Sequence, residues 1–388
     1  MNDIDLIKRG SVEIVSIEEL EEKLREKRAL RVKLGVDPTS PDLHLGHSVV
    51  LTKLRVFQDL GHRAVLIIGD FTAQIGDPSG RDSTRPILSF NDIIKNAESY
   101  TQQAFKILDK QKTDVVFNSK WLRNFLGFFE NTENNFIKVS RNITVSRLLE
   151  REDFKNRMKK ENPITLLEML YPIFQGYDSV AVDADVELGG QDQIFNLLVG
   201  RDIQKMYSKK PQVCITLPLL IGIDGVKKMS KSYGNYIAFN DSPSDMFGKI
   251  MSISDELMYQ YYEILTLEDM NTIKDMHPME AKKNLAAIIV ERFYDRNTAI
   301  EAKNRFEKIY SKREVPNDID VAKVEMPILL SRLLVKIGAA SSNNQARRLI
   351  ECGAVRINSE KIIKDVSVEK DGFILRCGKK FIKKIIKR

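Results

Sequence analysis

The fold is decided by residues 31–68, which read RVKLGVDPTSPDLHLGHSVVLTKLRVFQDLGHRAVLII. A short strand at 31–36 and an apolar strand at 64–68 flank a helix at 46–60, in which apolar residues recur with the period of a helix. Strand, helix and strand within about 40 residues predict a βαβ unit, and hence a parallel sheet with a right-handed crossover. Ligands bind beyond the carboxyl ends of such strands, so functional residues are expected there.

A second α/β segment follows a helical stretch. Residues 91–165 are predicted to be mainly helical and polar, with an insertion at about 121–162. Beyond them we expect a strand at 180–186, a helix at 193–206 and a strand at 214–220. These elements extend the βαβ unit into a Rossmann-like, doubly wound parallel sheet.

The remaining residues predict two further modules. Ser242 and Pro243 start an all-helical region that runs to about residue 312, and a charged linker is expected at 311–320. Farther on, a helix capped at 341–342 precedes short strands at 354–358 and 361–363. The predicted fold class is α/β, with a catalytic domain at 1–232, an α-helical domain and linker at 233–320, and a small α+β domain at 327–388.

Length and composition set the limits of this organisation. With 388 residues, 43% of them hydrophobic, the chain can hold one large core and smaller modules. No apolar run is long enough for a bilayer, and the N-terminus lacks the profile of a signal or transit peptide. Cys214, Cys352 and Cys377 are too scattered for a disulfide framework or a zinc site. We expect a cytoplasmic protein with no membrane partner and no metal site.

Positive charge is concentrated at the C-terminal end. Residues 327–388 hold 15 Lys and Arg against 5 Asp and Glu, a net charge of +10, so the rest of the chain carries −3 of the total of +7. Clustered positive charge favours a polyphosphate partner through counterion release. A solubilising surface is the alternative, but clustering in one module makes nucleic acid the better hypothesis.

The first motif, His44-Leu-Gly46-His47, lies at the start of the predicted helix, after the first strand. The free N–H groups and the dipole of a helix N-terminus suit a phosphate, and Gly46 lets a flat nucleotide approach the backbone. Taken alone, the two histidines could equally be ordinary loop residues, because short motifs recur by chance.

The second motif, Lys228-Met229-Ser230-Lys231-Ser232, follows a stretch bounded by glycines at 222 and 225. Two lysines three residues apart on such a loop can move onto a polyphosphate. A solvated basic turn is the alternative for any such pair, but the five-residue string is much more specific.

Together the two motifs resemble the signatures of class I aminoacyl-tRNA synthetases. Four further strings resemble the tyrosyl-tRNA synthetases, namely Gly35-Val-Asp37-Pro-Thr39, Ile75-Gly-Asp77-Pro-Ser-Gly80, Gly189-Gly-Gln-Asp192-Gln193 and Tyr171-x3-Gln175-x2-Asp178. The residues from about 327 resemble the S4-type RNA-binding domain of the bacterial members. The resemblance spans nearly the whole chain, and it implies a homodimer that uses L-tyrosine, ATP with Mg²⁺ and tRNA(Tyr), with no tightly bound cofactor.

The resemblance implies that catalysis comes from positioning and from stabilising charge on the phosphates. The implied catalytic residues are Thr39 and His44 at the departing phosphates, His47 beside the ribose, Lys228 and Lys231 as a clamp on pyrophosphate, and Arg81 and Arg85 on a second basic loop. The other residues implied to bind ATP are Gly35, Asp37, Gly46, Gly190, Asp192, Gln193, Met229 and Ser230.

Asp178 is implied to accept a hydrogen bond from the tyrosine hydroxyl, which phenylalanine could not supply. Asp77, Tyr171 and Gln175 would hold the α-ammonium group, and Tyr171, Gln175 and Asp178 fall on one helical face. Many family members carry a tyrosine at the position of Lys33. Either Lys33 donates to the substrate hydroxyl instead, or recognition relies more on Asp178.

RNA binding is assigned to the tail. Arg347 and Arg348 on the tail helix would follow the RNA backbone, and Lys379 and Lys380 add a basic end that could equally be a frayed terminus. Candidate dimer residues, which could equally belong to a core, are Phe125, Leu126, Phe128 and Phe129.

Three alternatives stay open. A tryptophanyl-tRNA synthetase is disfavoured by the S4-like tail and by Asp178. A nucleotidyltransferase with the HxGH motif would lack the lysine motif. A catalytically silent RNA-binding relative is disfavoured because both motifs are intact.

Overall fold

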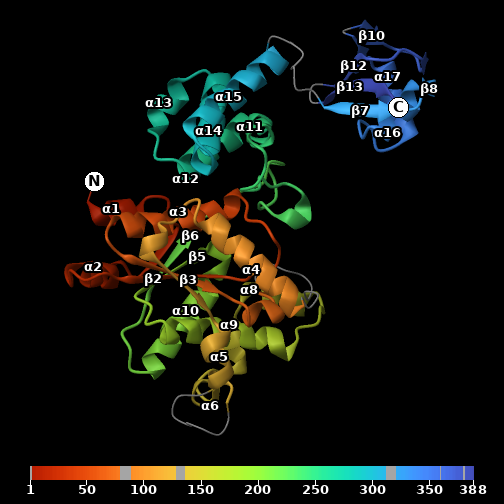
Figure 1. The fold of residues 1–388 in the computed structure, drawn as a ribbon. Helices are drawn as coiled ribbons and strands as arrows, with labels where there is room; N and C mark the ends of the chain where they lie inside the picture. Colours follow the sequence, from red (N-terminus) through yellow and green to blue (C-terminus); the bar gives the residue numbers. More distant parts are fainter. Residues whose placement is uncertain (1, 79–88, 128–135, 312–319, 359, 379–380) are drawn as a thin grey trace. The chain divides into compact units, whose positions relative to one another are not determined.

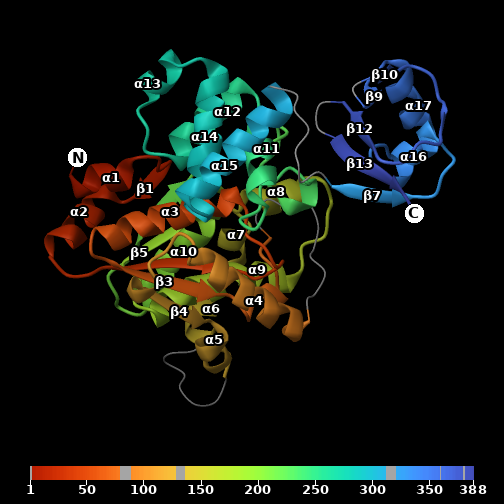
Figure 2. The ribbon, with the colours of Figure 1, turned by 45° about the horizontal axis from the view of Figure 1, so that its top comes forward.

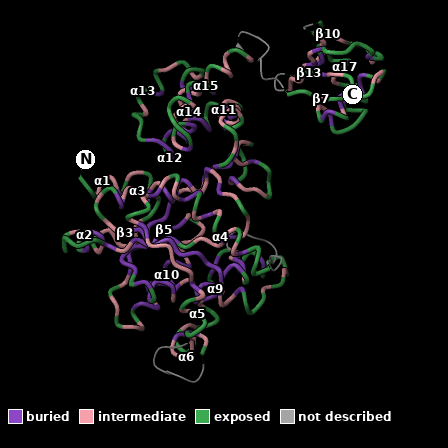
Figure 3. Tube along the Cα trace, in the orientation of Figure 1, coloured by how far each residue is buried: buried purple, intermediate pink, exposed green. Residues whose placement is uncertain are grey.

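The computed structural model describes the whole chain except residues 1, 79–88, 128–135, 312–319, 359 and 379–380. The described residues form two compact units, Met1–Ile300 and Glu301–Arg388. Each unit has its own sheet and its own buried residues, which Figure 3 shows as purple segments.

A six-stranded sheet organises the first unit (Figure 1). Across the sheet the strands are β1 (Glu13–Val15), β6 (Val213–Leu217), β5 (Val186–Gly190), β2 (Arg31–Val36), β3 (Arg63–Ile68) and β4 (Thr113–Phe117). Neighbours from β6 to β4 are parallel, whereas β1 pairs antiparallel with β6 and sets Glu13 opposite Thr216. The predicted parallel sheet is confirmed. Strand order reverses between β2 and β5, which is where such sheets bind ligands.

Helices cover both faces of this sheet. In Figures 1 and 2, α3 (Leu45–Asp59) lies on one side and α9 (Leu166–Ala181) and α10 (Ile194–Met206) lie on the other. Successive strand residues face opposite sides, so Val65 and Ile67 pack on the side of Val182 and Ala184, after α9. The third residue of β2, Lys33, is paired with Val65 of β3, so its side chain lies on the same side of the sheet and points towards α9.

The prediction of a strand at 180–186 is wrong. Helix α9 runs to Ala181, Asp183 turns the chain with a φ of 49°, and strand β5 begins only at Val186. The β-branched valines suggested a strand, but packing of α9 against α10 prevails. A Cβ at Gly176 would lie 3.2 Å from the Gly200 nitrogen, so the two helices approach closely at these glycines.

The stretch 91–165 is mainly helical, as predicted, but it contains strand β4, which the prediction missed. Its short apolar run is too brief to distinguish a strand from a helix by periodicity. The helices are α4 (Phe90–Ala104), α5 (Ser119–Phe125), α6 (Phe136–Ser140), α7 (Val145–Leu148) and α8 (Glu152–Lys159). The first unit also contains α1 (Asp3–Lys8) and α2 (Ile17–Arg25), which precede and follow strand β1.

The all-helical region is confirmed. Ser242 caps its first helix by accepting a hydrogen bond from the Asp245 nitrogen. The helices are α11 (Pro243–Met251), α12 (Asp255–Leu265), α13 (Met270–Asp275), α14 (Pro278–Phe293) and α15 (Arg296–Phe306). Most of this region belongs to the same compact unit as the sheet, so the predicted boundary after residue 232 stays a prediction.

The second unit is the predicted small α+β module. Its five-stranded sheet has the order β10 (Glu360–Ile362), β9 (Val355–Ile357), β12 (Phe373–Cys377), β13 (Phe381–Lys387) and β7 (Val321–Val324), and β11 (Ser367–Val368) pairs with β8 (Ile328–Leu329). Helices α16 (Leu330–Lys336) and α17 (Asn343–Glu351) share a core with the strands, and Ser342 caps α17 as expected. None of the described helices is long and apolar enough to span a membrane.

Candidate active site

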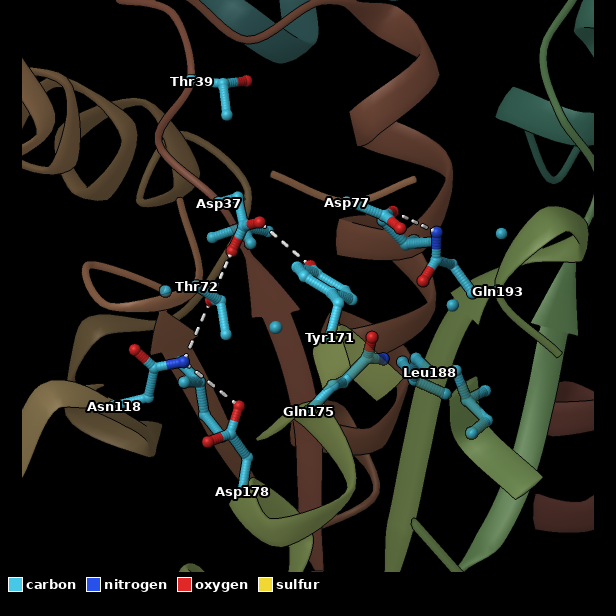
Figure 4. Close-up of a pocket in the computed structure, with 18 of the residues that line it drawn as sticks. Asp37, Thr39, Thr72, Asp77, Asn118, Tyr171, Gln175, Asp178, Leu188 and Gln193 are labelled. Carbon is cyan, nitrogen blue, oxygen red and sulfur yellow. Dashed lines mark hydrogen bonds between the residues drawn. The ribbon is translucent and has the colours of Figure 1, made fainter. Parts of the chain in front are cut away.

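A cavity of about 250 Å³ opens at the carboxyl ends of β2, β3 and β5, where the strand order reverses. Figure 4 shows side chains from these strands and from α9 that line it. Ten of the residues singled out from the sequence line this cavity: Gly35, Asp37, Thr39, His47, Asp77, Tyr171, Gln175, Asp178, Gly190 and Gln193. Segments far apart in the sequence therefore meet in one cavity.

Asp178 is buried at one end of the cavity, only 3% exposed. One carboxylate oxygen accepts a hydrogen bond from the Trp121 indole at 2.7 Å, and the other from the Asn118 amide at 3.3 Å. Burial raises the pKa of Asp178 to about 7, while the nearby Lys33 and these two hydrogen bonds oppose that rise. The carboxylate is thus a hydrogen-bond acceptor that burial makes easy to protonate.

Asp37 connects Tyr171 on α9 with Thr72, which follows β3. The Tyr171 hydroxyl donates to one of its oxygens at 2.9 Å and the Thr72 hydroxyl to the other at 2.7 Å. Asn118 donates to Thr72 at 3.0 Å and also to Asp178, so the chain of hydrogen bonds in Figure 4 runs from Tyr171 to Asp178. The resemblance assigned Asp37 to ATP, but its observed contacts belong to the wall that carries Tyr171.

A second network orients Asp77, Gln193 and Gln175, which also line the cavity. Gln193 donates to Asp77 at 2.7 Å, and the Asn196 amide donates to the side-chain oxygens of Gln193 at 3.0 Å and Gln175 at 2.9 Å. The buried Arg151 donates to Asn196 at 2.9 Å, which fixes how that amide is turned. The carboxylate of Asp77 and the amide of Gln175 are therefore held in place before any ligand arrives.

The two motif histidines pack against each other at the N-terminus of α3, with ring centroids 4.0 Å apart and ring planes tilted by 47°. The His44 backbone nitrogen donates to Nδ1 of His47 at 3.1 Å. Burial lowers the pKa of His44 to about 2 and that of His47 to about 4, so both rings are neutral at pH 7. A Cβ at Gly46 would lie 3.0 Å from the His44 ring, so glycine makes room for that ring.

The lysine motif lies on a folded loop. Lys228 donates to Asp192 at 3.2 Å and Lys231 to the Ser40 hydroxyl at 2.9 Å. Burial lowers the pKa of Lys231. Met229 is buried, and its nitrogen donates to the Leu220 carbonyl at 2.7 Å.

The side chain of Asn235 forms hydrogen bonds within this loop. Its side-chain oxygen accepts from the Ser230 nitrogen at 2.8 Å, and its amide donates to the Asp224 carboxylate at 2.9 Å. The same amide lies 3.3 Å from the Lys227 carbonyl and 3.2 Å from the Lys228 carbonyl. One buried side chain therefore contacts Ser230, Asp224, Lys227 and Lys228 of this loop.

Lys33 is not among the residues that line the cavity, and its role in binding the substrate stays a prediction. Its ammonium group donates to the Gln175 carbonyl at 2.8 Å and the Ser179 hydroxyl at 2.7 Å, and lies 2.9 Å from the Glu187 carboxylate. An ammonium group has three N–H donors, so these contacts use all of them. Direct donation to a substrate hydroxyl has no support.

Some assigned residues lie outside the described part of the chain, namely Arg81, Arg85, Lys379, Lys380, Phe128 and Phe129. Phe125 is 1% exposed and stacks on Tyr177 with ring centroids 3.9 Å apart, so it belongs to the core of the insertion. Leu126 packs partly buried against the same core. Arg347 and Arg348 are exposed on α17.

Sequence reasoning missed five residues that shape the site: Thr72, Asn118, Trp121, Asn196 and Asn235. Each is a polar side chain that acts by contacting another protein residue, and no motif marked it. Trp121 offered the only available signal, because it is the single tryptophan of the chain.

Two family models match the chain. The one described as "tRNA synthetases class I (W and Y)" matches residues 25–311, and the one described as "Tyrosine--tRNA ligase SYY-like C-terminal domain" matches residues 311–382. The first match covers well over half of the chain and includes strands β2 to β6, the cavity and both motifs. These features define a class I tRNA synthetase.

Similar sequences narrow the class. Tyrosine–tRNA ligase of Aquifex aeolicus is 52% identical, with 98% of this chain and 97% of the relative covered. That of Thermotoga maritima is 49% identical, with 97% and 95% covered. The chain belongs to the tyrosine–tRNA ligase family, as its motifs suggested.

Solved structures share the fold at low sequence identity. A truncated mitochondrial tyrosyl-tRNA synthetase of Aspergillus nidulans is 20% identical with a TM-score of 0.65, covering 79% of this chain and 94% of that one. The tyrosyl-tRNA synthetase of Archaeoglobus fulgidus, complexed with L-tyrosine, is 23% identical with a TM-score of 0.63, covering 78% and 98%. They support the α/β fold class.

Proposed function

We propose that this protein is a tyrosine–tRNA ligase. It activates L-tyrosine with ATP to give tyrosyl-adenylate and pyrophosphate, and then transfers tyrosine to the 3′ end of tRNA(Tyr). The observation that carries the substrate assignment is the buried Asp178 carboxylate, which accepts hydrogen bonds at one end of a cavity whose other wall carries Asp77.

Asp178 accepts a hydrogen bond from the substrate hydroxyl. Phenylalanine lacks that hydroxyl and would leave a buried acceptor without its partner, which is costly. Asp77, Gln175 and Tyr171 receive the α-ammonium group, and Asp77 attracts it by charge. Support comes from the networks that hold these groups, because a preorganised site loses less free energy when it binds.

Activation is attack by the substrate carboxylate on the α-phosphate of ATP, and it needs no protein nucleophile. ATP enters with Mg²⁺ as the substrate. His44 and His47, being neutral, donate N–H groups to the phosphates and the ribose without an added charge. Thr39 and the motif lysines stabilise the departing pyrophosphate electrostatically. Arg81 and Arg85 have the same role as a prediction from the sequence alone.

The remaining ATP contacts follow the family pattern. Gly35, Gly46 and Gly190 let the nucleotide approach the backbone, and Asp192 and Gln193 bind the ribose. Met229 and Ser230 lie between the two lysines of the motif and belong to the same ATP-binding loop. In the observed structure Lys228 is paired with Asp192, so ATP binding exchanges that pair for contacts with ribose and phosphate.

The positively charged tail binds tRNA, with Arg347 and Arg348 on its surface and Lys379 and Lys380 as further candidates. We also propose that the enzyme is a cytoplasmic homodimer. A monomer in sedimentation at working concentrations would contradict the dimer. Replacing Arg347 and Arg348 by alanine should raise the KM for tRNA in aminoacylation and leave tyrosine activation unchanged.

ATP–pyrophosphate exchange with tyrosine, phenylalanine and tryptophan tests the reaction and the pocket. The wild type should exchange with tyrosine alone. Asp178→Asn keeps the side-chain volume and should lose or relax that selectivity. Asp59→Asn, an exposed carboxylate on α3, is the matched control and should behave as wild type.

Each other result has a definite meaning. Exchange with tryptophan would assign the protein to the sister enzyme. Exchange with no amino acid would favour the silent RNA-binding alternative. Unchanged selectivity in Asp178→Asn would remove Asp178 from substrate recognition while leaving the reaction intact.

A further inference from the structure

Lys33 is a fully buried cation beneath the substrate cavity. It is 0% exposed and points from β2 towards α9, where its ammonium group contacts Gln175, Ser179 and Glu187. Burying a charge is costly, and a buried ion pair can often be replaced by apolar residues without loss of stability. A stabilising role alone therefore does not explain a lysine here.

Glu187 on β5 fixes the position of this charge. It is 1% exposed, lies 2.9 Å from the Lys33 ammonium, and accepts from Gln175 and Ser179, both at 3.2 Å. Gln212 also donates to it. The ion pair therefore lies against residues 175–179 of α9, the turn that carries Asp178.

The charges of Lys33 and Glu187 act on the Asp178 carboxyl group. The charged and polar groups that face it are Lys33 from β2, Glu187 from β5, Trp121 from α5 and Asn118 before α5. Burial raises the pKa of Asp178 to about 7, Lys33 is the strongest influence that lowers it, and Glu187 raises it to a smaller extent. An ionised carboxylate makes hydrogen bonds roughly twice as strong as a neutral group.

We propose that Lys33 is a positioning residue for substrate selection: its buried ammonium group, held by Glu187, supports the 175–179 turn and keeps Asp178 in the carboxylate form that accepts the tyrosine hydroxyl. This role rests on the proposed function for the identity of the substrate. It replaces direct contact between Lys33 and the substrate by an effect through Asp178.

Trp121 provides a direct readout of this effect. It is the only tryptophan in the chain, and its indole donates to Asp178 at 2.7 Å. Its fluorescence in the enzyme without substrates should therefore change as Asp178 titrates, with a midpoint near pH 7. Asp178→Asn should abolish this transition, which separates it from the titration of other groups.

Lys33→Met should move the fluorescence midpoint to higher pH by about one unit, because a nearby opposite charge typically lowers an aspartate pKa by one unit or more. Lys53→Met is the matched control. Lys53 is also a buried lysine, 6% exposed, but it donates to the carbonyls of Leu6, Ile7 and Arg9 near the N-terminus. The fluorescence midpoint of Lys53→Met should equal that of the wild type.

Lys33→Met leaves Glu187 unpaired and could unfold the protein. Lys33→Met/Glu187→Gln removes both charges and leaves none unpaired. Its midpoint should still exceed that of the wild type, though by less. A midpoint equal to that of the wild type in whichever variant folds would overturn the proposal.

The KM for tyrosine in ATP–pyrophosphate exchange links this titration to selection. In Lys33→Met the KM for tyrosine should rise about tenfold for each unit by which the pH falls below the new midpoint. At high pH this KM should approach the wild-type value, and kcat should change little. A KM raised equally at every pH would mean a merely structural role. Absence of tyrosine exchange in the wild type would instead defeat the proposed function and leave the fluorescence result standing.

Discussion

Asn235→Ala tests whether the lysine motif depends on a preformed loop. Asn235 is 3% exposed and connects Ser230, Asp224 and the Lys228 carbonyl. Alanine would remove these hydrogen bonds and leave buried partners unsatisfied. With about 1 kcal/mol for each of two to three hydrogen bonds, the ordered loop should lose about 2–3 kcal/mol.

That loss should appear in the rate of activation. Each 1.4 kcal/mol corresponds to about a tenfold change, so kcat for tyrosine activation should fall about 30- to 150-fold if the order is needed only in the transition state. The KM for tyrosine should stay unchanged, because Lys228 and Lys231 do not line the cavity around Asp178.

Pre-steady-state formation of tyrosyl-adenylate measures this effect separately from product release. Asn142→Ala is the control, because Asn142 donates one hydrogen bond to the Lys138 carbonyl on an exposed helix end. An unchanged rate in a folded Asn235→Ala variant would refute the reasoning. So would a rise in the KM for tyrosine that accounts for the whole loss of kcat/KM.

Three further predictions concern packing and pH. Gly46→Ala should lower kcat about tenfold or more at unchanged thermal stability, since its Cβ would displace the His44 ring, and stopped-flow activation measures this. Gly176→Ala should destabilise the fold by about 1–3 kcal/mol in urea unfolding, because its Cβ would lie 2.8 Å from Ile203; equal stability would contradict the close approach of α9 and α10. The raised pKa of Asp178 favours folding at low pH, and this contribution is lost as pH rises from about 4 through about 7. The free energy of unfolding of Asp178→Asn, relative to that of the wild type, should thus increase by up to about 4 kcal/mol between pH 4 and pH 8. A difference that is the same at every pH would contradict the raised pKa of Asp178.

The parts of the fold that were predicted correctly have strong local signals. The βαβ unit at 31–68 combines a helical period with an apolar strand, and local patterning agrees with tertiary packing there. The strand expected at 180–186 is wrong because valines favour strands locally, whereas α9, which approaches α10 closely at Gly176 and Gly200, continues to Ala181. Packing between distant glycines leaves no local pattern.

The site residues that were predicted from the sequence also differ from those that were missed in the strength of their local signals. Residues within short motifs, such as His47 and Asp178, were found because their chemistry and spacing are visible in the sequence. Trp121 and Asn235 were missed because each acts on another side chain that only the fold brings near. Lys33 was noticed as a departure, but its direction towards α9 and its pairing with Glu187 depend on the sheet.

The pairing of β1 with β6 has a consequence for synthesis of the chain on the ribosome. Glu13 lies opposite Thr216, so the strand made first borders the strand of this sheet made last. At roughly 5–20 residues per second, about 10–40 s separate the two. Throughout that interval the nascent N-terminal segment has no β6 with which to pair, and β1 can join the sheet only after β6 has left the exit tunnel.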